Sequence, residues 1–264
     1  MSRMAGVIAA RYVLASARLA SRGALAGDVG WGLLACRLLW AVASVERTDR
    51  AYAGQAIYTR GFLAVYDALV YGFNSPVLWR CSKARIIELY DANVSARHLD
   101  IGVGSGRVLD DCHFPVPEPA LTLMDLNPNS LAVASRRLER YHPAIHQANA
   151  LEPWGLPANS FDSIGMSHLL HCLPGAMPEK TVVFEYADAA LAPGGVLFGA
   201  TILGEGVKHT RLSRAVMRAN NRQGVLSNLE DRLVDLNAGL ERTFASHEIH
   251  VEGAVALFTA RSQD

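Results

Sequence analysis

The sequence predicts an α/β protein with a doubly wound, mostly parallel sheet, and two observations carry this prediction. From residue 97 onward, short apolar runs alternate with segments whose apolar residues have helical spacing. Strands that alternate with helices pair in parallel and carry helices on both faces of the sheet. Near the C-terminus, two further β-rich runs meet at Gly253, which fits an antiparallel strand at that end of the sheet.

The individual elements follow from the local pattern of apolar residues and from capping residues. A helix is expected over residues 74–94, because Asn74 or Ser75 can cap it and Pro76 is tolerated in its first turn. Strands are expected at 97–101, 121–125, 145–149, 161–166 and 195–202, helices between them at 106–112, 129–141 and 178–191, and a turn at 193–195.

The N-terminal part of the chain reads as helix. We expect a helical extension over residues 1–50, serving as a lid, an oligomer contact or a targeting segment, and one main domain over residues 51–264. The first 27 residues hold four arginines and no acidic residue, a pattern that organellar transit peptides share. The apolar stretch 29–45 is too short to span a bilayer and contains Arg37, so we expect it to pack against a second subunit of a homo-oligomer.

The composition narrows the class of function. Basic and acidic residues number 25 each, so the formal net charge is zero and the chain lacks the basic footprint of a nucleic-acid-binding protein. The four cysteines are widely scattered without CxxC spacing, which predicts neither a metal site nor a disulfide framework, and fits reduced thiols in the cytoplasm. No stretch is long and apolar enough to predict a membrane span.

A glycine-rich loop follows the first expected strand in the sequence "HLDIGVGSGRVLD". Gly102, Gly104 and Gly106 allow the backbone to pass close to a ligand. Their spacing is G-x-G-x-G, whereas dinucleotide-binding loops have G-x-G-x-x-G. The preceding Asp100 would repel a pyrophosphate and attract an ammonium group. The loop therefore predicts a ligand that carries an amine.

Polar residues also end the next expected strands. Asp125 closes the second strand, where a carboxylate can accept both hydroxyls of a ribose. Asn149 closes the third strand and can bond an adenine edge or form a turn. Ser167 and His168 close the fourth strand. Because the carboxyl ends of parallel strands meet at one edge of the sheet, these residues are expected to form one site.

In this order, the motifs resemble those of the class I S-adenosylmethionine-dependent methyltransferases over residues 58–264. The segment "YTRGFLAVYDALVYGFNSPVLWRC" is similar to one found in actinobacterial enzymes that tailor natural products. The resemblance implies a Rossmann-like sheet of seven strands and S-adenosylmethionine as the cofactor. It also implies in-line methyl transfer to a small-molecule acceptor, expected to be a secondary metabolite, with no nucleic acid or membrane as partner.

The resemblance also implies roles for individual residues. Asp100 and the Gly102–Gly106 loop would lie along the methionine moiety, and Asp125 would hold the ribose. Leu126 would pack on the adenine. Asn149, where many relatives carry Asp, and Ala150 would bound the adenine edge. The expected cofactor-binding residues are thus Asp100, Gly102, Gly104, Gly106, Asp125, Leu126, Asn149, Ala150 and Ser167.

The catalytic residues and the acceptor remain more open. His168 and His171 are expected at the mouth of the site as general-base candidates, although His171 also fits a packing role. Tyr58 and Tyr66 are expected in the segment that covers the cofactor. Aromatic residues there favour an aromatic or isoprenoid carbon as acceptor, with nitrogen and oxygen left open. Two alternative functions remain open from the sequence: an NAD(P)-dependent oxidoreductase on a similar sheet, and a non-catalytic partner subunit with the methyltransferase fold.

Overall fold

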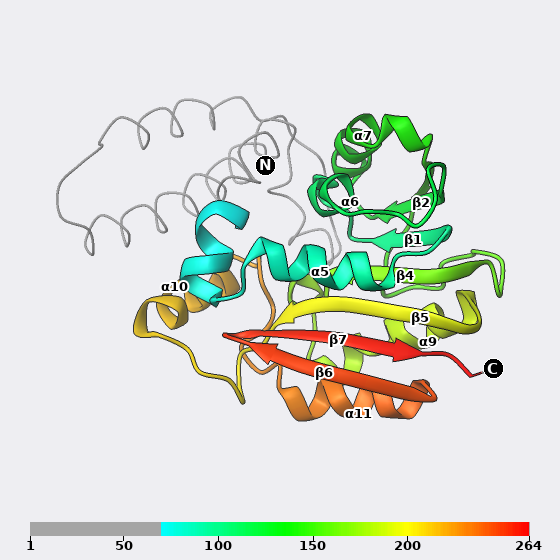
Figure 1. Ribbon diagram of the computed structural model, residues 1–264. Coiled ribbons are helices and arrows are strands. Elements are labelled where there is room, and N and C mark those ends of the chain that lie inside the picture. Colours follow the sequence, from blue (N-terminus) through cyan, green and yellow to red (C-terminus); the bar gives the residue numbers. More distant parts are fainter. Residues whose placement is uncertain (1–69, 264) are drawn as a thin grey trace, which may run out of the picture.

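The computed structural model describes residues 70–263, whose centre is one seven-stranded sheet. The strand order is β3-β2-β1-β4-β5-β7-β6, with parallel pairing from β3 to β5 and with β7 antiparallel to both β5 and β6 (Figure 1). This order confirms the predicted fold class. The strands are β1 Arg97–Ile101, β2 Ala120–Asp125, β3 Ala144–Gln147, β4 Phe161–Ser167, β5 Leu191–Ile202, β6 Ser246–Glu252 and β7 Val255–Arg261.

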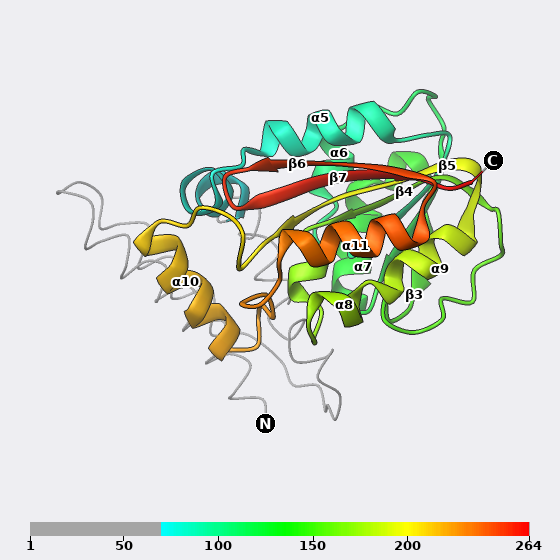
Figure 2. The same cartoon turned by 90° about the horizontal axis from the view of Figure 1, so that it is seen from below.

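Helices cover both faces of the sheet and divide the apolar core into two layers. One layer packs beneath α5, α6 and α7, and the other beneath α8, α9 and α11. In the view from below, α5 lies on one side of the strands, and α8, α9 and α11 lie on the other (Figure 2). From β1 the chain adds β2 and β3 on one side, and from β4 it adds β5 on the other side. Because crossovers between parallel strands are right-handed, helices of the two halves fall on opposite faces of the sheet. The bounds are α5 Lys83–Asn93, α6 Arg107–Asp111, α7 Pro128–Arg137, α8 Met177–Lys180, α9 Val182–Ala190, α10 Arg211–Arg222 and α11 Leu233–Thr243.

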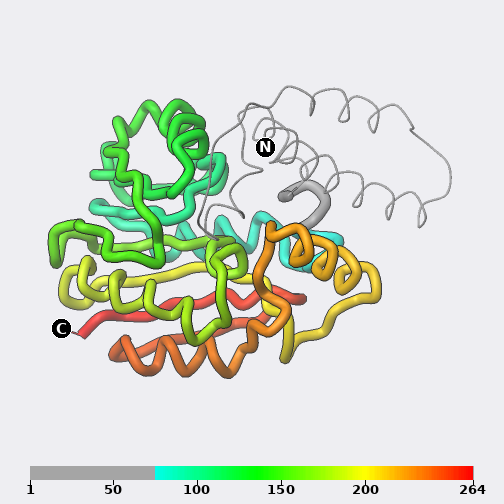
Figure 3. The backbone as a smooth tube through the Cα atoms, turned by 180° about the vertical axis from the view of Figure 1, so that it is seen from behind, coloured from blue at the N-terminus to red at the C-terminus, as the bar shows by residue number. Residues whose placement is uncertain are grey.

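Short helical turns complete the described chain: a π-helix η1 at Val70–Trp79 and two 3-10 turns, η2 at Glu139–Tyr141 and η3 at Leu170–Cys172. Seen from behind, the green segment that holds α7 and the orange α11 lie at opposite ends of the sheet (Figure 3). In residues 70–263 no helix has the length and apolar character needed to cross a membrane.

The single helix expected over residues 74–94 is wrong. Pro76 lies inside η1, and Arg80 takes a left-handed backbone with φ of 56°. The chain therefore breaks there and starts α5 at Lys83, where the Ser82 hydroxyl accepts a hydrogen bond from the Arg85 N–H. The N-cap is thus Ser82 rather than Asn74 or Ser75. Ser82 is the first residue after the break whose side chain can accept a hydrogen bond from the first turn of α5.

Two boundaries near β5 also differ from expectation. The helix expected over 178–191 is interrupted at Thr181, between α8 and α9. β5 starts at Leu191, which pairs with Phe161, and the register then shifts so that Ser163 pairs with Val196. The expected turn at 193–195 is therefore an irregularity inside the strand. The expectations for residues 1–69, which include the helical extension, Tyr58 and Tyr66, lie outside the described residues.

Candidate active site

A pocket lies at the carboxyl ends of β1, β2 and β4, where the strand order reverses around β1. Ligands of open α/β sheets bind at this position. All nine of the expected cofactor-binding residues line the pocket, and His168 lines it with them. The nine are Asp100, Gly102, Gly104, Gly106, Asp125, Leu126, Asn149, Ala150 and Ser167.

The glycine loop turns tightly between β1 and α6 and approaches α7 closely. Gly106 has φ of 72°, and a Cβ added there would lie 3.0 Å from the Ala134 Cβ. Gly104 has φ of 56°, and the nearest atom to such a Cβ is 4.0 Å away. Gly106 is therefore required for packing, whereas Gly104 leaves open space beside the carboxylates of Asp100 and Asp125, which both line the pocket.

The Asp125 carboxylate is held by backbone donors. Its Oδ1 accepts from the Asn127 N–H at 2.8 Å, and its Oδ2 accepts from the Gly104 N–H at 3.3 Å. Burial raises the pKa of Asp125 to about 6, against the lowering effect of these two hydrogen bonds. The N-cap of α7 is Asn127. Asp125 is thus free of that capping role and presents a carboxylate to the pocket.

Asn149 forms a local turn as well as lining the pocket. Its Nδ2 donates to Glu152 Oε1 at 2.8 Å, and its Oδ1 accepts from the Leu151 N–H at 3.1 Å. The turn-forming alternative is therefore present in the structure.

His168 sits at the end of β4 in a left-handed conformation, with φ of 61°. Its backbone N–H donates to the Ala200 carbonyl at 2.7 Å, which fixes the residue against β5. Its Nδ1 lies 3.0 Å from Ser167 Oγ. Burial lowers the pKa of His168 to about 4, so the imidazole is neutral at pH 7.

His171 lies behind His168 and is not among the residues that line the pocket. The two rings meet edge-on with centroids 5.6 Å apart. The His171 Nδ1 accepts from the Ile202 N–H at 3.2 Å, and its carbonyl accepts from the Ser227 N–H at 2.8 Å. Burial lowers the pKa of His171 well below its usual value. These contacts fit the packing role that the sequence left open.

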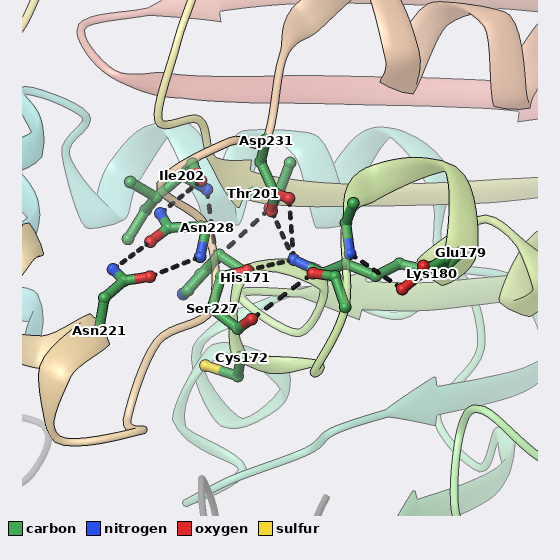
Figure 4. A network of polar contacts seen from close by, with 12 residues as sticks. His171, Cys172, Glu179, Lys180, Thr201, Ile202, Asn221, Ser227, Asn228 and Asp231 are labelled. Carbon is green, nitrogen blue, oxygen red and sulfur yellow. Dashed lines mark hydrogen bonds and ion pairs between the residues drawn. The ribbon is translucent and has the colours of Figure 1, made fainter. Parts of the chain in front are cut away.

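A buried ion pair anchors the segment that contacts His171 (Figure 4). Lys180 of α8 lies 2.7 Å from an Asp231 oxygen, and its ammonium also donates to the Ser227 carbonyl. Asn228 donates to the Ile202 carbonyl at 2.9 Å. The connection between α10 and α11 is thereby fixed to β5 and α8, next to the pocket.

Sequence reasoning missed Tyr90 and the apolar side of the pocket. Tyr90 of α5 lines the pocket and donates its hydroxyl hydrogen to Asp100 Oδ2 at 2.8 Å. No motif marks Tyr90, because its helix precedes the strand pattern and only the packing of α5 on β1 brings the two residues together. The apolar side is formed beyond His168 by Leu169, Cys172, Leu173 and Pro174.

Comparison with known proteins identifies the family. A family model described as a methyltransferase domain matches residues 99–197. Demethylluteothin O-methyltransferase of Streptomyces thioluteus is 43% identical over 211 residues, which cover 80% of this chain and 92% of that protein. A physcion biosynthesis cluster O-methyltransferase of Aspergillus chevalieri is 36% identical over 209 residues, which cover 78% of this chain and 94% of that protein.

Solved structures share the fold at low sequence identity. The DhpI complex with SAH has a TM-score of 0.56 at 17% identity, and the match covers 81% of this chain and 97% of that chain. Phosphoethanolamine N-methyltransferase 2 of Haemonchus contortus, solved with S-adenosyl-L-methionine, has a TM-score of 0.59 at 14% identity. That match covers 83% of this chain and 61% of the other.

The fold, the pocket and these relatives define an S-adenosylmethionine-dependent enzyme that methylates a small molecule. The chain belongs to the class I S-adenosylmethionine-dependent methyltransferases. The pocket lining is compatible with this cofactor, because the carboxylates of Asp100 and Asp125 both line it and carboxylates can accept from an ammonium group and from a ribose diol. Membership of this methyltransferase family argues against the oxidoreductase alternative.

Proposed function

We propose that this enzyme methylates an oxygen atom of a small secondary metabolite. The observation that carries the proposal is the 43% identity to an O-methyltransferase over 92% of that protein's length. The physcion-cluster relative is named an O-methyltransferase as well. Oxygen thus replaces the carbon acceptor that the aromatic residues near the N-terminus had favoured.

The pocket residues supply the cofactor contacts in this proposal. The Asp100 carboxylate accepts from the ammonium of the methionine moiety, and the bare backbone of the glycine loop lies along it. The Asp125 carboxylate, fixed by Gly104 and Asn127, accepts from the ribose hydroxyls. Leu126 packs on the adenine, whose edge is bounded by Asn149 and Ala150. When bound, S-adenosylmethionine supplies an electrophilic methyl group on a sulfonium, and Ser167 lies beside that end of the pocket.

His168 is the general base of the proposed reaction. Its Nδ1 lies 3.0 Å from Ser167 Oγ, and in the tautomer in which Nδ1 donates to that hydroxyl, Nε2 is the basic nitrogen. Burial holds the pKa of His168 near 4, so the ring is neutral over the working pH range but is a weak base. A weak base suits an acidic hydroxyl. Phenols and enols are therefore the acceptors to compare first with alkyl alcohols.

The proposal extends to the segments around the site. His171 supports the His168 ring from behind through its own hydrogen bonds to β5 and Ser227. The proposed methyltransferase domain begins near residue 51 and so includes Tyr58 and Tyr66, the further candidates for catalytic residues. The alignment of 211 residues with the Streptomyces relative is longer than the described segment, which supports an earlier domain start. The preceding helical extension joins subunits of a cytoplasmic homo-oligomer.

An acceptor screen tests the proposal. The full-length enzyme is incubated with S-adenosylmethionine and matched pairs of acceptors that differ only in having a phenolic or enolic hydroxyl, an alkyl hydroxyl, or an amine. Mass spectrometry of the products is expected to show O-methylation of the phenols or enols. Methylation at carbon or nitrogen alone would overturn the oxygen assignment, and turnover of alkyl alcohols at similar rates would overturn the requirement for an acidic hydroxyl.

A further inference from the structure

A buried polar cluster lies behind the pocket, on the face of the sheet that α5 covers. The Asp100 Oδ2 accepts from the Tyr90 hydroxyl at 2.8 Å and lies 3.6 Å from His98 Nε2. The other ring nitrogen, His98 Nδ1, lies 2.7 Å from Ser163 Oγ. All four residues are buried, and His98 and Ser163 have no exposed surface at all. The function derived above uses only Asp100 of this set.

The register of two strands creates the cluster. His98 of β1 pairs with Ser163 of β4, and Asp100 pairs with Gly165. Alternate residues of a strand share one face, so these four positions lie together on the same side of the sheet. A Cβ at Gly165 would lie only 2.7 Å from Asp100 Oδ2 and 3.3 Å from His98 Cε1. Glycine at 165 therefore makes the space in which the histidine and the carboxylate meet.

The neighbouring hydrogen bonds are compatible with a proton on Nε2 of His98. Ser163 Oγ accepts from the Ser95 N–H at 2.9 Å, so the hydroxyl hydrogen of Ser163 is available to His98 Nδ1. With Nδ1 as acceptor, the neutral ring carries its hydrogen on Nε2 and directs it at Asp100 Oδ2. Among the described residues, His98 Nε2 has no hydrogen-bond partner. A buried N–H without a hydrogen-bond partner costs free energy of folding unless it interacts with the charge of the neighbouring carboxylate.

We propose that His98 is a positioning residue for the amino group of the cofactor and acts through Asp100. Tyr90 donates to Oδ2 and His98 Nε2 lies 3.6 Å from the same oxygen, so Oδ1 is the oxygen left for the cofactor in this proposal. In this tautomer the N–H of His98 also faces the Asp100 carboxylate. This inference rests on the proposed contact between Asp100 and the methionine ammonium.

Two substitutions separate the two nitrogens of the ring. In His98→Gln the side-chain amide reaches the place of Nε2 and keeps a donor toward Asp100. In His98→Asn the shorter amide reaches only the place of Nδ1 and keeps the contact with Ser163. Calorimetric titration of the full-length variants uses two ligands, S-adenosylhomocysteine and 5′-methylthioadenosine, which retains the nucleoside but lacks the amino-acid part. The ratio of the two affinities reports the ammonium contact.

The expected result is a selective loss in one variant. His98→Asn weakens S-adenosylhomocysteine binding about tenfold, which corresponds to about 1.4 kcal/mol, and leaves 5′-methylthioadenosine binding within about twofold. His98→Gln retains most of the wild-type ratio. Equal loss of both ligands in both variants, or no change in the ratio in His98→Asn, would overturn the proposal. If the histidine variants fail to fold, Tyr90→Phe removes a single hydroxyl from the same oxygen and is expected to lower the same ratio.

Asp100→Asn distinguishes this inference from the proposed function on which it rests. The preference for S-adenosylhomocysteine over 5′-methylthioadenosine is the quantity to compare. If Asp100→Asn loses this preference but His98→Asn and Tyr90→Phe keep it, the positioning role is rejected and the ammonium contact stands. An unchanged ratio in Asp100→Asn would reject the contact itself.

Discussion

The carboxylate of Asp125 and the backbone of Gly104 are joined by a hydrogen bond of 3.3 Å. The bond links the ends of β1 and β2 across the pocket, so the glycine loop and the proposed ribose ligand are fixed relative to each other. Burial opposes the charge that this arrangement needs and raises the pKa of Asp125 to about 6. The ligand-free site is therefore sensitive to pH in a range where most carboxylates are already ionised.

The affinity for S-adenosylhomocysteine is expected to rise between pH 5 and pH 7 and then to level. Ribose hydroxyls donate to the ionised carboxylate, so binding favours the form that Asp125 takes above its pKa of about 6. Asp125→Asn is expected to bind at least tenfold more weakly, in line with the loss of charged hydrogen bonds, and without this pH dependence. Calorimetry at pH 5, 6, 7 and 8 checks both. Equal wild-type affinity at pH 5 and pH 8 would refute the role of this ionisation.

Gly106→Ala is expected to destabilise the protein more than Gly155→Ala. Both glycines have left-handed backbones, with φ of 72° and 67°, so both substitutions introduce similar strain of about 1 kcal/mol. Only at Gly106 would the added Cβ meet another segment, Ala134 of α7 at 3.0 Å, whereas nothing lies within 4 Å at Gly155. Urea unfolding of the two variants measures the difference. Equal free energies of unfolding for the two variants would show that the glycine loop and α7 can move apart without a cost in stability.

The order of the strands from β1 to β7 was predictable because it rests on alternation of apolar runs, which the sheet's two faces impose directly. The cofactor-side residues were predictable for a related reason. They follow the ends of parallel strands, so their positions in space are determined by the topology.

Features that depend on packing between distant segments were not predictable. Arg80 adopts φ of 56° although nothing in its identity requires it, and this break moved the start of α5. Tyr90 reaches Asp100 only because α5 packs on β1. The helix α11 was not anticipated either. His171 stands close to His168 in the sequence, but the short turn η3 directs its ring toward Ile202 instead of the pocket.

Lys180→Met is expected to lower the free energy of unfolding by about 3–5 kcal/mol, because it leaves the Asp231 carboxylate buried without its partner. Burial already raises the pKa of Asp231 to about 6, and removal of the ammonium raises it further. A raised carboxyl pKa makes the folded state bind more protons, so the stability of the variant falls as pH rises from about 4 through that pKa. In urea unfolding, the free energy of unfolding that Lys180→Met loses relative to the wild type is therefore expected to be larger at pH 8 than at pH 5.

Two further variants control for the loss of an ion pair as such. Lys180→Met combined with Asp231→Leu removes both charges and is expected to recover much of the stability. Arg232→Met breaks an exposed pair with Asp235 and is expected to change stability little. A deficit in Lys180→Met that is the same at both pH values would mean that Asp231 is solvated in the variant.

His168→Gln is expected to lower kcat by a factor of about 100 or more, the range for loss of a general base. The affinity for S-adenosylhomocysteine should change far less, because the proposed role concerns the acceptor proton. Since the pKa of His168 is about 4, protonation of this ring should not lower kcat in the wild type until the pH approaches 4. Steady-state kinetics between pH 5 and pH 8 on a phenolic acceptor measure both quantities. If kcat of the wild type falls below about pH 6.5 and this fall disappears in His168→Gln, the ring ionises with an ordinary pKa. If kcat is unchanged in His168→Gln, a group other than His168 takes the proton of the acceptor hydroxyl.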